Sequence, residues 1–537
     1  MPTLEWIGKE KVINHHQDVP FRVLDKQYTF NADTSENMII HGDNLLALKS
    51  LLPQYEGMID CIYIDPPYNT GNEKWVYNDN VNDPKIKKWL GEVVGAEGED
   101  LSRHDKWLCM MYPRLKLLQK LLSERGVVFI SIDDNEQANL RILCDEIFGK
   151  SNFIAQILVK RQGGRQDSKH FAVVHEYCIC YAKNIILFHA GMDSKTDSIY
   201  PKFDEERKRY YKTQLLRKWG ANSLRENRPN LYYPITAPDG MQIYPTIYQK
   251  KASNDLQFDK IEGCWRWSAN NMATAIKEGR VEFIKDSIGN WIPYEKIFAP
   301  EAGEKETKKF TTWQEETGNG TNILKQIFGE TPFDYPKAVN LLELILKMAN
   351  TNKNSIILDS FAGSGTTAHA VLNLNKQDGG NRKFILVEMM DYAETITAER
   401  VKRVIKGYGE GDKAIEGTGG SFSYYELGAP IFKEDKNLNE DIDEEEIRKY
   451  VYFTETKQPL DRNSDDCRYF LGKYADTSYY FYYEKENVTT LNMEFLTKVK
   501  TQAEGYVIYA DRCVLSDDYL REHGIVFKKI PRDISKF

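Results

Sequence analysis

The four residues Asp65-Pro66-Pro67-Tyr68 follow directly after an apolar run at residues 60–64. Two prolines hold the backbone in an extended, rigid turn, and because neither has an N–H, the Pro66 carbonyl is free to accept a hydrogen bond. The Asp65 carboxylate supplies a second acceptor, and Tyr68 supplies a flat ring. Asp-Pro-Pro by itself is usually only a turn. Its place after an apolar run instead predicts a site that orients a planar base with an exocyclic amine.

A second segment, residues 358–367 (LDSFAGSGTT), follows another apolar run and opens a helix. Its glycines allow a ligand to approach the backbone closely. The third glycine of a G-x-G-x-x-G pattern falls on Ala368, and Glu388 ends the next apolar run, 25 residues after Gly363. An acid near that distance commonly binds ribose hydroxyls. Together they predict a nucleoside cofactor, although a dinucleotide site has a similar loop and Glu388 alone equally fits a surface acid.

Alternating strands and helices must position these two segments. Apolar runs predict strands at residues 38–41, 60–64, 127–132, 355–358 and 384–387. Helical spacing predicts helices at 44–52, at 106–125 with its end at Gly126, and from Thr366 onward. Such alternation implies an α/β fold with a mostly parallel sheet. Ligands bind outside the carboxyl ends of the strands in such sheets, where both segments fall.

Composition excludes several classes of protein. The chain has 537 residues, is 41% hydrophobic and carries a net charge of −8, so about three or four domains are expected. Its 8 cysteines form no C-x-x-C pair, and no apolar stretch approaches the ~18 residues of a membrane span. The first residues lack a basic region followed by an apolar run. These features predict a cytoplasmic protein without a disulfide scaffold or a zinc cage.

The charge is unevenly distributed. Residues 160–228 hold fifteen Lys and Arg against eight Asp and Glu, about +7. Such a run is usually a solvated helical face, but Gly163-Gly164 between two arginines favours a basic loop. Six glycines in residues 407–420 predict a linker, and eight acids follow within residues 434–446. Beyond them, the aromatic residues of 468–483 predict strands that pack in a core.

Both chemical segments resemble amino-methyltransferases that methylate a base in DNA with S-adenosylmethionine. The Asp-Pro-Pro-Tyr segment precedes the Phe361 segment by nearly 300 residues, the circularly permuted order of the family's β class. Asp at the first position is typical of adenine-N6 enzymes, whereas cytosine-N4 enzymes more often carry Ser. Five segments resemble modification subunits of Type III restriction–modification systems: 65–71, 103–108, 111–115, 129–136 and 525–532. The chain is somewhat short for that family, and its middle region cannot be matched residue by residue.

The resemblance implies a Rossmann-like S-adenosylmethionine methyltransferase sheet with an inserted target recognition domain and a small C-terminal α+β domain. The expected divisions are an N-terminal arm (1–35), two methyltransferase parts (36–155 and 321–406), the target recognition domain (156–320), a glycine-rich linker (407–421) and the C-terminal domain (422–537).

Site residues follow from the same resemblance. The target adenine is expected at Asp65, Pro66, Pro67 and Tyr68. The residues expected to bind the cofactor are Asp43, Phe333, Lys337, Asp359, Phe361, Gly363, Gly365, Thr366 and Glu388. Among these, Lys337 is expected to meet the cofactor carboxylate, and Asp43 is equally well explained as a helix N-cap. The DNA contacts expected in the basic stretch are Lys160, Arg161, Arg165, Lys169, Arg225 and Arg228.

The expected reaction is transfer of a methyl group to N6 of a flipped adenine in double-stranded DNA, without a metal. The chain has no G-x-x-x-x-G-K-[ST] segment, so no P-loop ATPase is expected on it. The Type III resemblance implies that ATP hydrolysis and cleavage belong to a separate restriction subunit. The resemblance also implies a homodimer. The alternatives are a stand-alone methyltransferase, an N4-cytosine enzyme, a DNA-binding module with a silent pocket, and a nicotinamide dehydrogenase.

Overall fold

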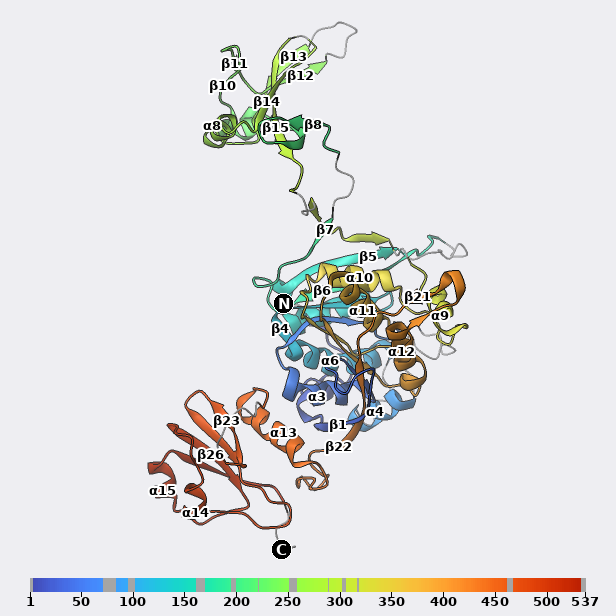
Figure 1. Cartoon of the computed structure of the whole chain (residues 1–537), viewed down its shortest axis with the longest axis vertical. Helices are drawn as coiled ribbons and strands as arrows, with labels where there is room; N and C mark the ends of the chain where they lie inside the picture. The colour runs from blue at the N-terminus through green and yellow to red at the C-terminus, as the bar shows by residue number, and fades with distance from the viewer. Residues whose placement is uncertain are drawn as a thin grey trace. The chain divides into compact units, whose positions relative to one another are not determined.

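The computed structural model describes residues 3–70, 84–94, 102–160, 170–194, 199–220, 222–250, 258–287, 289–301, 306–315, 318–460 and 467–532. The chain divides into two compact units (Figure 1). Asp193–Lys309 form one, called here the inserted unit. Met1–Met192 and Phe310–Phe537 together form the other, called the sheet unit. Among the described helices, none combines the length and apolarity that crossing a membrane requires.

A ten-stranded sheet organises the sheet unit, in the order β1-β22-β2-β19-β18-β3-β4-β6-β5-β17. Its strands are β1 (Arg22–Phe30), β22 (Phe422–Pro430), β2 (Met38–His41), β19 (Lys383–Glu388), β18 (Ile356–Asp359), β3 (Ile59–Ile64), β4 (Leu122–Ile132), β6 (His175–Ala182), β5 (Phe153–Lys160) and β17 (Trp313–Glu315). From β22 to β4 all neighbours are parallel. Strand β6 runs antiparallel to β4 and β5. The expected α/β class is confirmed.

Helices cover both faces of this sheet because its central strands are apolar on both sides. In β19, Ile385 and Val387 belong to the core that contains α3 (Asn44–Tyr55), α6 (Arg103–Leu121) and α7 (Gln137–Cys144). Phe384 and Leu386 point to the opposite core, with α9 (Gly320–Phe328), α10 (Val339–Met348), α11 (Thr366–Asp378) and α12 (Glu399–Lys406). Both faces of the central strands are therefore buried under helices.

The end of the helix expected at residues 106–125 is wrong. Helix α6 begins earlier, at a capping box formed by Ser102 and Asp105, and ends at Leu121. Strand β4 then starts at Leu122 and runs through Gly126. A Cβ at Gly126 would lie 2.7 Å from the carbonyl oxygen of Ile59 in β3. The glycine therefore permits close strand pairing rather than ending a helix.

The C-terminal part of the sheet unit has its own four-stranded sheet, ordered β23-β24-β26-β28. Its elements are α13 (Glu444–Thr456), β23 (Phe470–Tyr474), β24 (Thr477–Phe481), α14 (Met493–Leu496), β26 (Gly505–Ala510), α15 (Asp517–Glu522) and β28 (Ile525–Lys529). Tyr480 and Phe481 are buried, so the aromatic run packs in a core as expected. The expected glycine-rich linker contains the short pair β20 (Gly407–Tyr408) and β21 (Ile415–Glu416). Strand β22, expected in the C-terminal domain, instead extends the main sheet.

The inserted unit is built on an antiparallel sheet ordered β14-β15-β9-β8. Its elements are β8 (Lys202–Asp204), β9 (Arg209–Leu215), β10 (Ile235–Thr236), β11 (Gln242–Ile243), β12 (Thr246–Lys250), β13 (Phe258–Glu262), α8 (Ala269–Lys277), β14 (Val281–Lys285) and β15 (Trp291–Phe298). Trp265 and Met272 occupy its core. This unit is shorter than the 156–320 segment expected, because the apolar residues of β5 and β6 pack in the main sheet.

Candidate active site

A small pocket, with a cavity volume of about 20 Å³, lies beside the carboxyl ends of β3 and β18. Because neighbouring parallel strands end at the same edge of a sheet, the two chemical segments meet there. Seven of the residues expected from the sequence line it: Asp65, Phe333, Lys337, Asp359, Phe361, Gly363 and Thr366. The other lining residues are Tyr63, Tyr335, Pro336, Ala362, Ser364 and Thr367. Of the predicted base site, Asp65 lines this pocket beside the predicted cofactor loop, whereas Pro66, Pro67 and Tyr68 do not.

The turn that carries Asp65 is held from behind by polar contacts. Trp107 on α6 is fully buried, and its Nε1 donates to the Pro67 carbonyl at 2.6 Å. Asn69 adopts a left-handed φ of 59° and donates from Nδ2 to the buried carboxylate of Glu136. His104 Nδ1 lies 2.6 Å from the same carboxylate. These hydrogen bonds hold the turn in place. No sequence spacing predicts the residues that make them.

Tyr68 of the same turn and two side chains from distant segments, Glu176 and Lys337, meet beside Asp65. The Tyr68 hydroxyl donates to Glu176 Oε2 at 3.1 Å. Lys337 Nζ donates to the Tyr68 oxygen at 2.7 Å and to Glu176 Oε1 at 2.8 Å. The same Nζ lies 3.3 Å from Asp65 Oδ1. Sequence reasoning missed Glu176, which is 4% exposed on β6.

The electrostatics of Asp65 balance burial against one cation. Burial raises the pKa of the Asp65 carboxyl, and the negative charge of Glu176 raises it further. The Lys337 ammonium lowers the same pKa. Lys337 was expected to meet the cofactor carboxylate, but the structure places its ammonium against Asp65, Tyr68 and Glu176. Its ammonium therefore lies beside residues expected at the base.

The glycine loop is held by the acid at the end of β19. Glu388 Oε2 accepts from the Gly363 N–H at 2.8 Å, and Oε1 accepts from the Met390 N–H at 2.9 Å. Gly363 has a φ of 52°, and its carbonyl accepts from Thr397 Oγ1 at 2.6 Å. Burial raises the pKa of Glu388 to about 7. Glu388 is thus one hydrogen bond from the pocket wall, although it does not line the pocket itself.

Asp359 anchors the other side of the loop. Its Oδ1 accepts from the Phe361 N–H at 3.0 Å, and its Oδ2 accepts from Thr367 Oγ1 at 2.5 Å. The side chain is buried, which raises its pKa to about 7. The Asp359 carboxyl group therefore holds the loop and also lines the pocket.

A fully buried arginine lies beneath the loop, and the sequence carried no signal for it. Arg400 Nη1 donates to Ser364 Oγ at 2.8 Å and to Thr366 Oγ1 at 2.7 Å. Burial lowers its pKa to about 9. The guanidinium, carried by α12, joins that helix to the start of α11 and so holds the loop in place.

Besides Glu388, two more residues expected at the cofactor do not line the pocket. Asp43 caps α3, accepting from the Leu45 and Leu46 N–H groups at 2.8 and 3.1 Å, as the N-cap alternative predicts. Gly365 precedes α11 with a φ of 80°, and a Cβ there would lie 3.1 Å from the Thr397 carbonyl oxygen. Gly365 is therefore needed because the start of α11 passes close to the backbone of Thr397.

The expected DNA contacts are divided between the two units. Lys160 ends β5 and pairs with Glu315 at 3.0 Å. Arg225 and Arg228 belong to the inserted unit, where Arg225 pairs with Glu262 at 2.7 Å. Three further candidates lie outside the described residues: Arg161, Arg165 and Lys169. Within the described ranges, no three His, Cys, Asp or Glu side chains are grouped to hold a metal ion.

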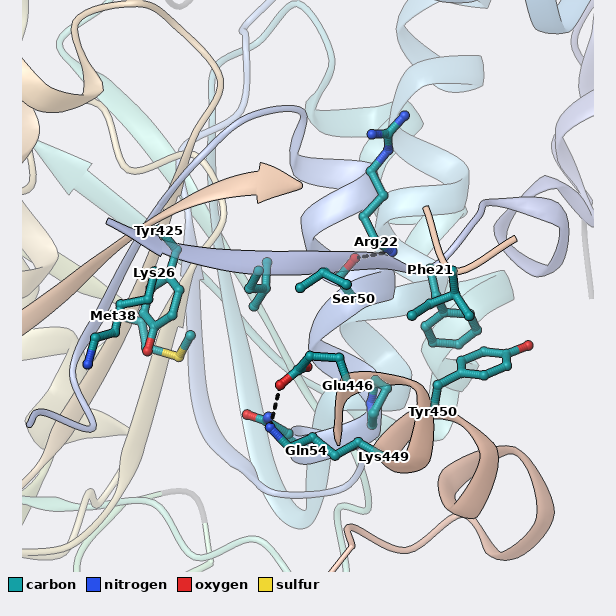
Figure 2. A pocket seen from close by; sticks show the side chains of 14 residues that line it. Phe21, Arg22, Lys26, Met38, Ser50, Gln54, Tyr425, Glu446, Lys449 and Tyr450 are labelled. Carbon is teal, nitrogen blue, oxygen red and sulfur yellow. Dashed lines mark hydrogen bonds and ion pairs between the residues drawn. The ribbon is translucent and has the colours of Figure 1, made fainter. Parts of the chain in front are cut away.

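A larger pocket, with a cavity volume of about 250 Å³, lies elsewhere in the sheet unit (Figure 2). It is bordered by β1, α3, β22 and α13, and side chains such as Phe21, Met38 and Tyr450 line it. None of the residues expected at the site belongs to it. Volume therefore does not identify the site, whereas the convergence of buried acids and the glycine loop does.

Two solved methyltransferases were compared with the structure. PvuII DNA methyltransferase, described as cytosine-N4-specific, is 11% identical with a TM-score of 0.33, covering 68% of this chain and 87% of its own. The complex of M1.HpyAVI with SAM is 14% identical with a TM-score of 0.30, covering 68% and 99%. Superpositions this weak do not establish a shared fold.

Sequence comparison is more informative. The EcoPI Mod subunit of a Type III enzyme from Escherichia phage P1 is 34% identical over 72% of this chain and 63% of its own length. The StyLTI Mod subunit from Salmonella typhimurium is also 34% identical, over 71% and 57%. The chain thus spans about three fifths of these two relatives. The Type II methyltransferase M.KpnI from Klebsiella pneumoniae is 36% identical over 68% and 85%. A family described as DNA methylase matches residues 59–399, and the chain therefore belongs to this DNA methylase family.

Proposed function

We propose that this chain transfers a methyl group from S-adenosylmethionine to N6 of adenine in duplex DNA, after the base is flipped out of the stack. One observation carries the proposal. Asp65, at the end of β3, and the Gly363 loop, after β18, line a single pocket. Membership of the DNA methylase family and sequence similarity to a Mod subunit, at 34% identity, support the proposal. Asp at the first position of the turn favours adenine over cytosine.

The residues present fit the cofactor. Gly363 leaves the backbone open beside the pocket, and Phe333 and Phe361 offer apolar walls. Asp359 suits an amino group, and Glu388 suits ribose hydroxyls, because both are acids at the ends of adjacent strands. When bound, S-adenosylmethionine supplies a methyl group on a positively charged sulfur.

The protein's part in the reaction is orientation more than chemical activation. Asp65 and the Pro66 carbonyl accept hydrogen bonds from the exocyclic amine, which directs its lone pair away from the ring. Tyr68 replaces part of the stacking that the flipped base loses. As the amine nitrogen gains the methyl group it gains positive charge, and Asp65 is placed to accept the proton that leaves it.

We further propose that the chain is the modification subunit of a Type III system. Two Mod subunits at 34% identity support this assignment. It implies a homodimer, a cytoplasmic location and a separate restriction subunit that hydrolyses ATP. A stand-alone methyltransferase is the second candidate, favoured by the M.KpnI relative, of which the chain covers 85%. Adding the product of a neighbouring restriction gene distinguishes them, because ATP-dependent cleavage is expected only for the first.

Modification-aware sequencing tests the central proposal. DNA from a host that expresses the chain is expected to carry N6-methyladenine at one recurring sequence, whereas the host without it does not. Methylation at cytosine N4 would reassign the target base, and unmodified DNA would overturn the activity.

The basic segment allows a prediction about DNA affinity. Replacing Arg161 and Arg165 by glutamate is expected to flatten the plot of log affinity against log salt by about 1.8, because each lost phosphate contact removes ~0.9. Fluorescence anisotropy with a duplex at several salt concentrations measures this slope. The matched control replaces Arg512 and Arg521, exposed residues of the C-terminal region, and should leave the slope unchanged. An unaltered slope in the first variant would remove Arg161 and Arg165 from the DNA contacts.

Cofactor affinity is expected to depend on pH. Because the pKa of Glu388 is about 7, the carboxylate that accepts ribose hydroxyls is lost as the pH falls below neutrality. The dissociation constant for S-adenosylmethionine should rise roughly tenfold from pH 8 to pH 6 through this group. Calorimetry on wild type and Glu388→Gln compares the two profiles. The variant should bind more weakly at pH 8 and vary less with pH, and identical profiles would contradict the assignment.

A further inference from the structure

Three charged groups share one small buried volume on the base side of the pocket. The exposed fractions of the Asp65, Glu176 and Lys337 side chains are 9%, 5% and 14%. They come from the end of β3, from β6 and from the segment before α10, so only the folded chain brings them together. Buried carboxylates are costly unless an opposite charge accompanies them. One ammonium here serves two carboxylates.

The contacts divide the two carboxylates by role. Lys337 and Asp65 line the pocket, whereas Glu176 does not and lies behind Lys337 and Tyr68. Glu176 uses both carboxylate oxygens, one for the Tyr68 hydroxyl and one for the Lys337 ammonium. It therefore fixes two neighbours of Asp65 at once without lining the pocket.

We propose that Glu176 and Lys337 form a buried ion pair that serves the target base: Glu176 positions Lys337 and Tyr68, and Lys337 holds Asp65 as the charged acceptor of the exocyclic amine. Lys337 touches the base site itself, whereas Glu176 is a positioning residue that acts through Lys337 and Tyr68. This inference rests on the proposed function and assigns a base-side role to two residues, one of which had been expected at the cofactor.

Because Lys337 and Glu176 carry opposite charges, replacing them should shift the pKa of Asp65 in opposite directions, which tests the proposal. Lys337 favours the ionised form of Asp65 and Glu176 disfavours it. The acidic limb of the kcat/KM profile reports ionisation of free enzyme groups. Lys337→Met should therefore move that limb to higher pH, and Glu176→Gln should move it to lower pH. A purely structural role predicts no such opposite pair of shifts.

Other titrating groups near Asp65 do not confuse this result. Tyr63 on β3, Cys178 on β6 and Asp359 on β18 also act electrostatically on Asp65 or feel its charge. Burial raises the pKa of Tyr63 and of the Cys178 thiol well above neutrality. Asp359 titrates near pH 7 but is common to every variant. The difference between variants therefore isolates the pair.

The experiment measures methyl transfer by the full chain to duplex DNA from pH 5 to pH 9, with S-adenosylmethionine affinity measured separately by calorimetry. Lys337→Met leaves two carboxylates without their cation, so the double variant Lys337→Met with Glu176→Gln, which removes both charges, guards against misfolding. The double variant should return the acidic limb toward its wild-type position, although its kcat stays low because Tyr68 and Asp65 have lost the Lys337 ammonium. All three variants should bind the cofactor within about threefold of wild type.

The outcomes separate cleanly. The ion-pair role is overturned if the acidic limbs of the kcat/KM profiles of the two single variants shift in the same direction or do not shift. In that case, methylation by the wild type still supports the proposed function. More than tenfold weaker cofactor binding by Lys337→Met would return Lys337 to the cofactor carboxylate. An inactive wild type would count against the proposed function instead.

Discussion

Replacing Asp65 by alanine is expected to reduce methyl transfer by about a thousandfold or more, the scale of losing a preorganised group that acts on developing charge. The fold should survive, because Glu176 still neutralises Lys337 at 2.8 Å and the turn keeps the bond from Trp107 to Pro67. Affinity for S-adenosylmethionine should stay within a few-fold, since the glycine loop is untouched. Single-turnover methylation and calorimetry measure the two quantities.

Two further variants define what Asp65 contributes. Asp65→Asn keeps the shape and one acceptor oxygen but removes the charge, so it should lose nearly as much activity as the alanine variant. Asp60→Asn is the matched control at the other end of β3, where the side chain accepts from the Ile356 N–H at 3.0 Å and an amide oxygen can do the same. It should remain active. Wild-type activity in Asp65→Ala would refute the assigned role.

The second large effect is expected from Gly363→Leu, which should abolish measurable cofactor binding. A leucine side chain would occupy the pocket wall that the glycine leaves open. It would also strain the backbone, because Gly363 has a φ of 52°. The distorted loop would weaken the bond from the Gly363 N–H to Glu388. Calorimetric titration with S-adenosylmethionine is the measurement.

Gly379→Leu is the control for this change. Gly379 ends α11 with a φ of 67°, and nothing lies within 4 Å of a Cβ built there. Its backbone strain is therefore comparable, but it lines no part of the pocket. Both variants should lose similar stability on heating, and only Gly363→Leu should lose the cofactor. Normal binding by Gly363→Leu would place the cofactor elsewhere.

Local sequence predicted the central strands well because burial on both faces makes them continuous apolar runs. The strands expected at 38–41 and 60–64 are β2 and, with one more residue, β3. Gly126 misled the helix prediction, since a glycine that stops a helix and one that lets two strands approach are alike in sequence. The apolar runs of β5 and β6 likewise do not show in the sequence that these strands pair with the main sheet.

The candidate site divides in the same way. The sequence by itself determined the chemical groups, because Asp65, Tyr68 and Gly363 lie in short segments whose residue types have few other uses. Only the tertiary structure decided which partners surround them. Glu176 and Arg400 look like ordinary charged residues of a strand and a helix, and become functional candidates only through burial beside Lys337 and beneath the glycine loop. The reason is that charges interact according to their separation in space, and for residues far apart in sequence only the fold sets that separation.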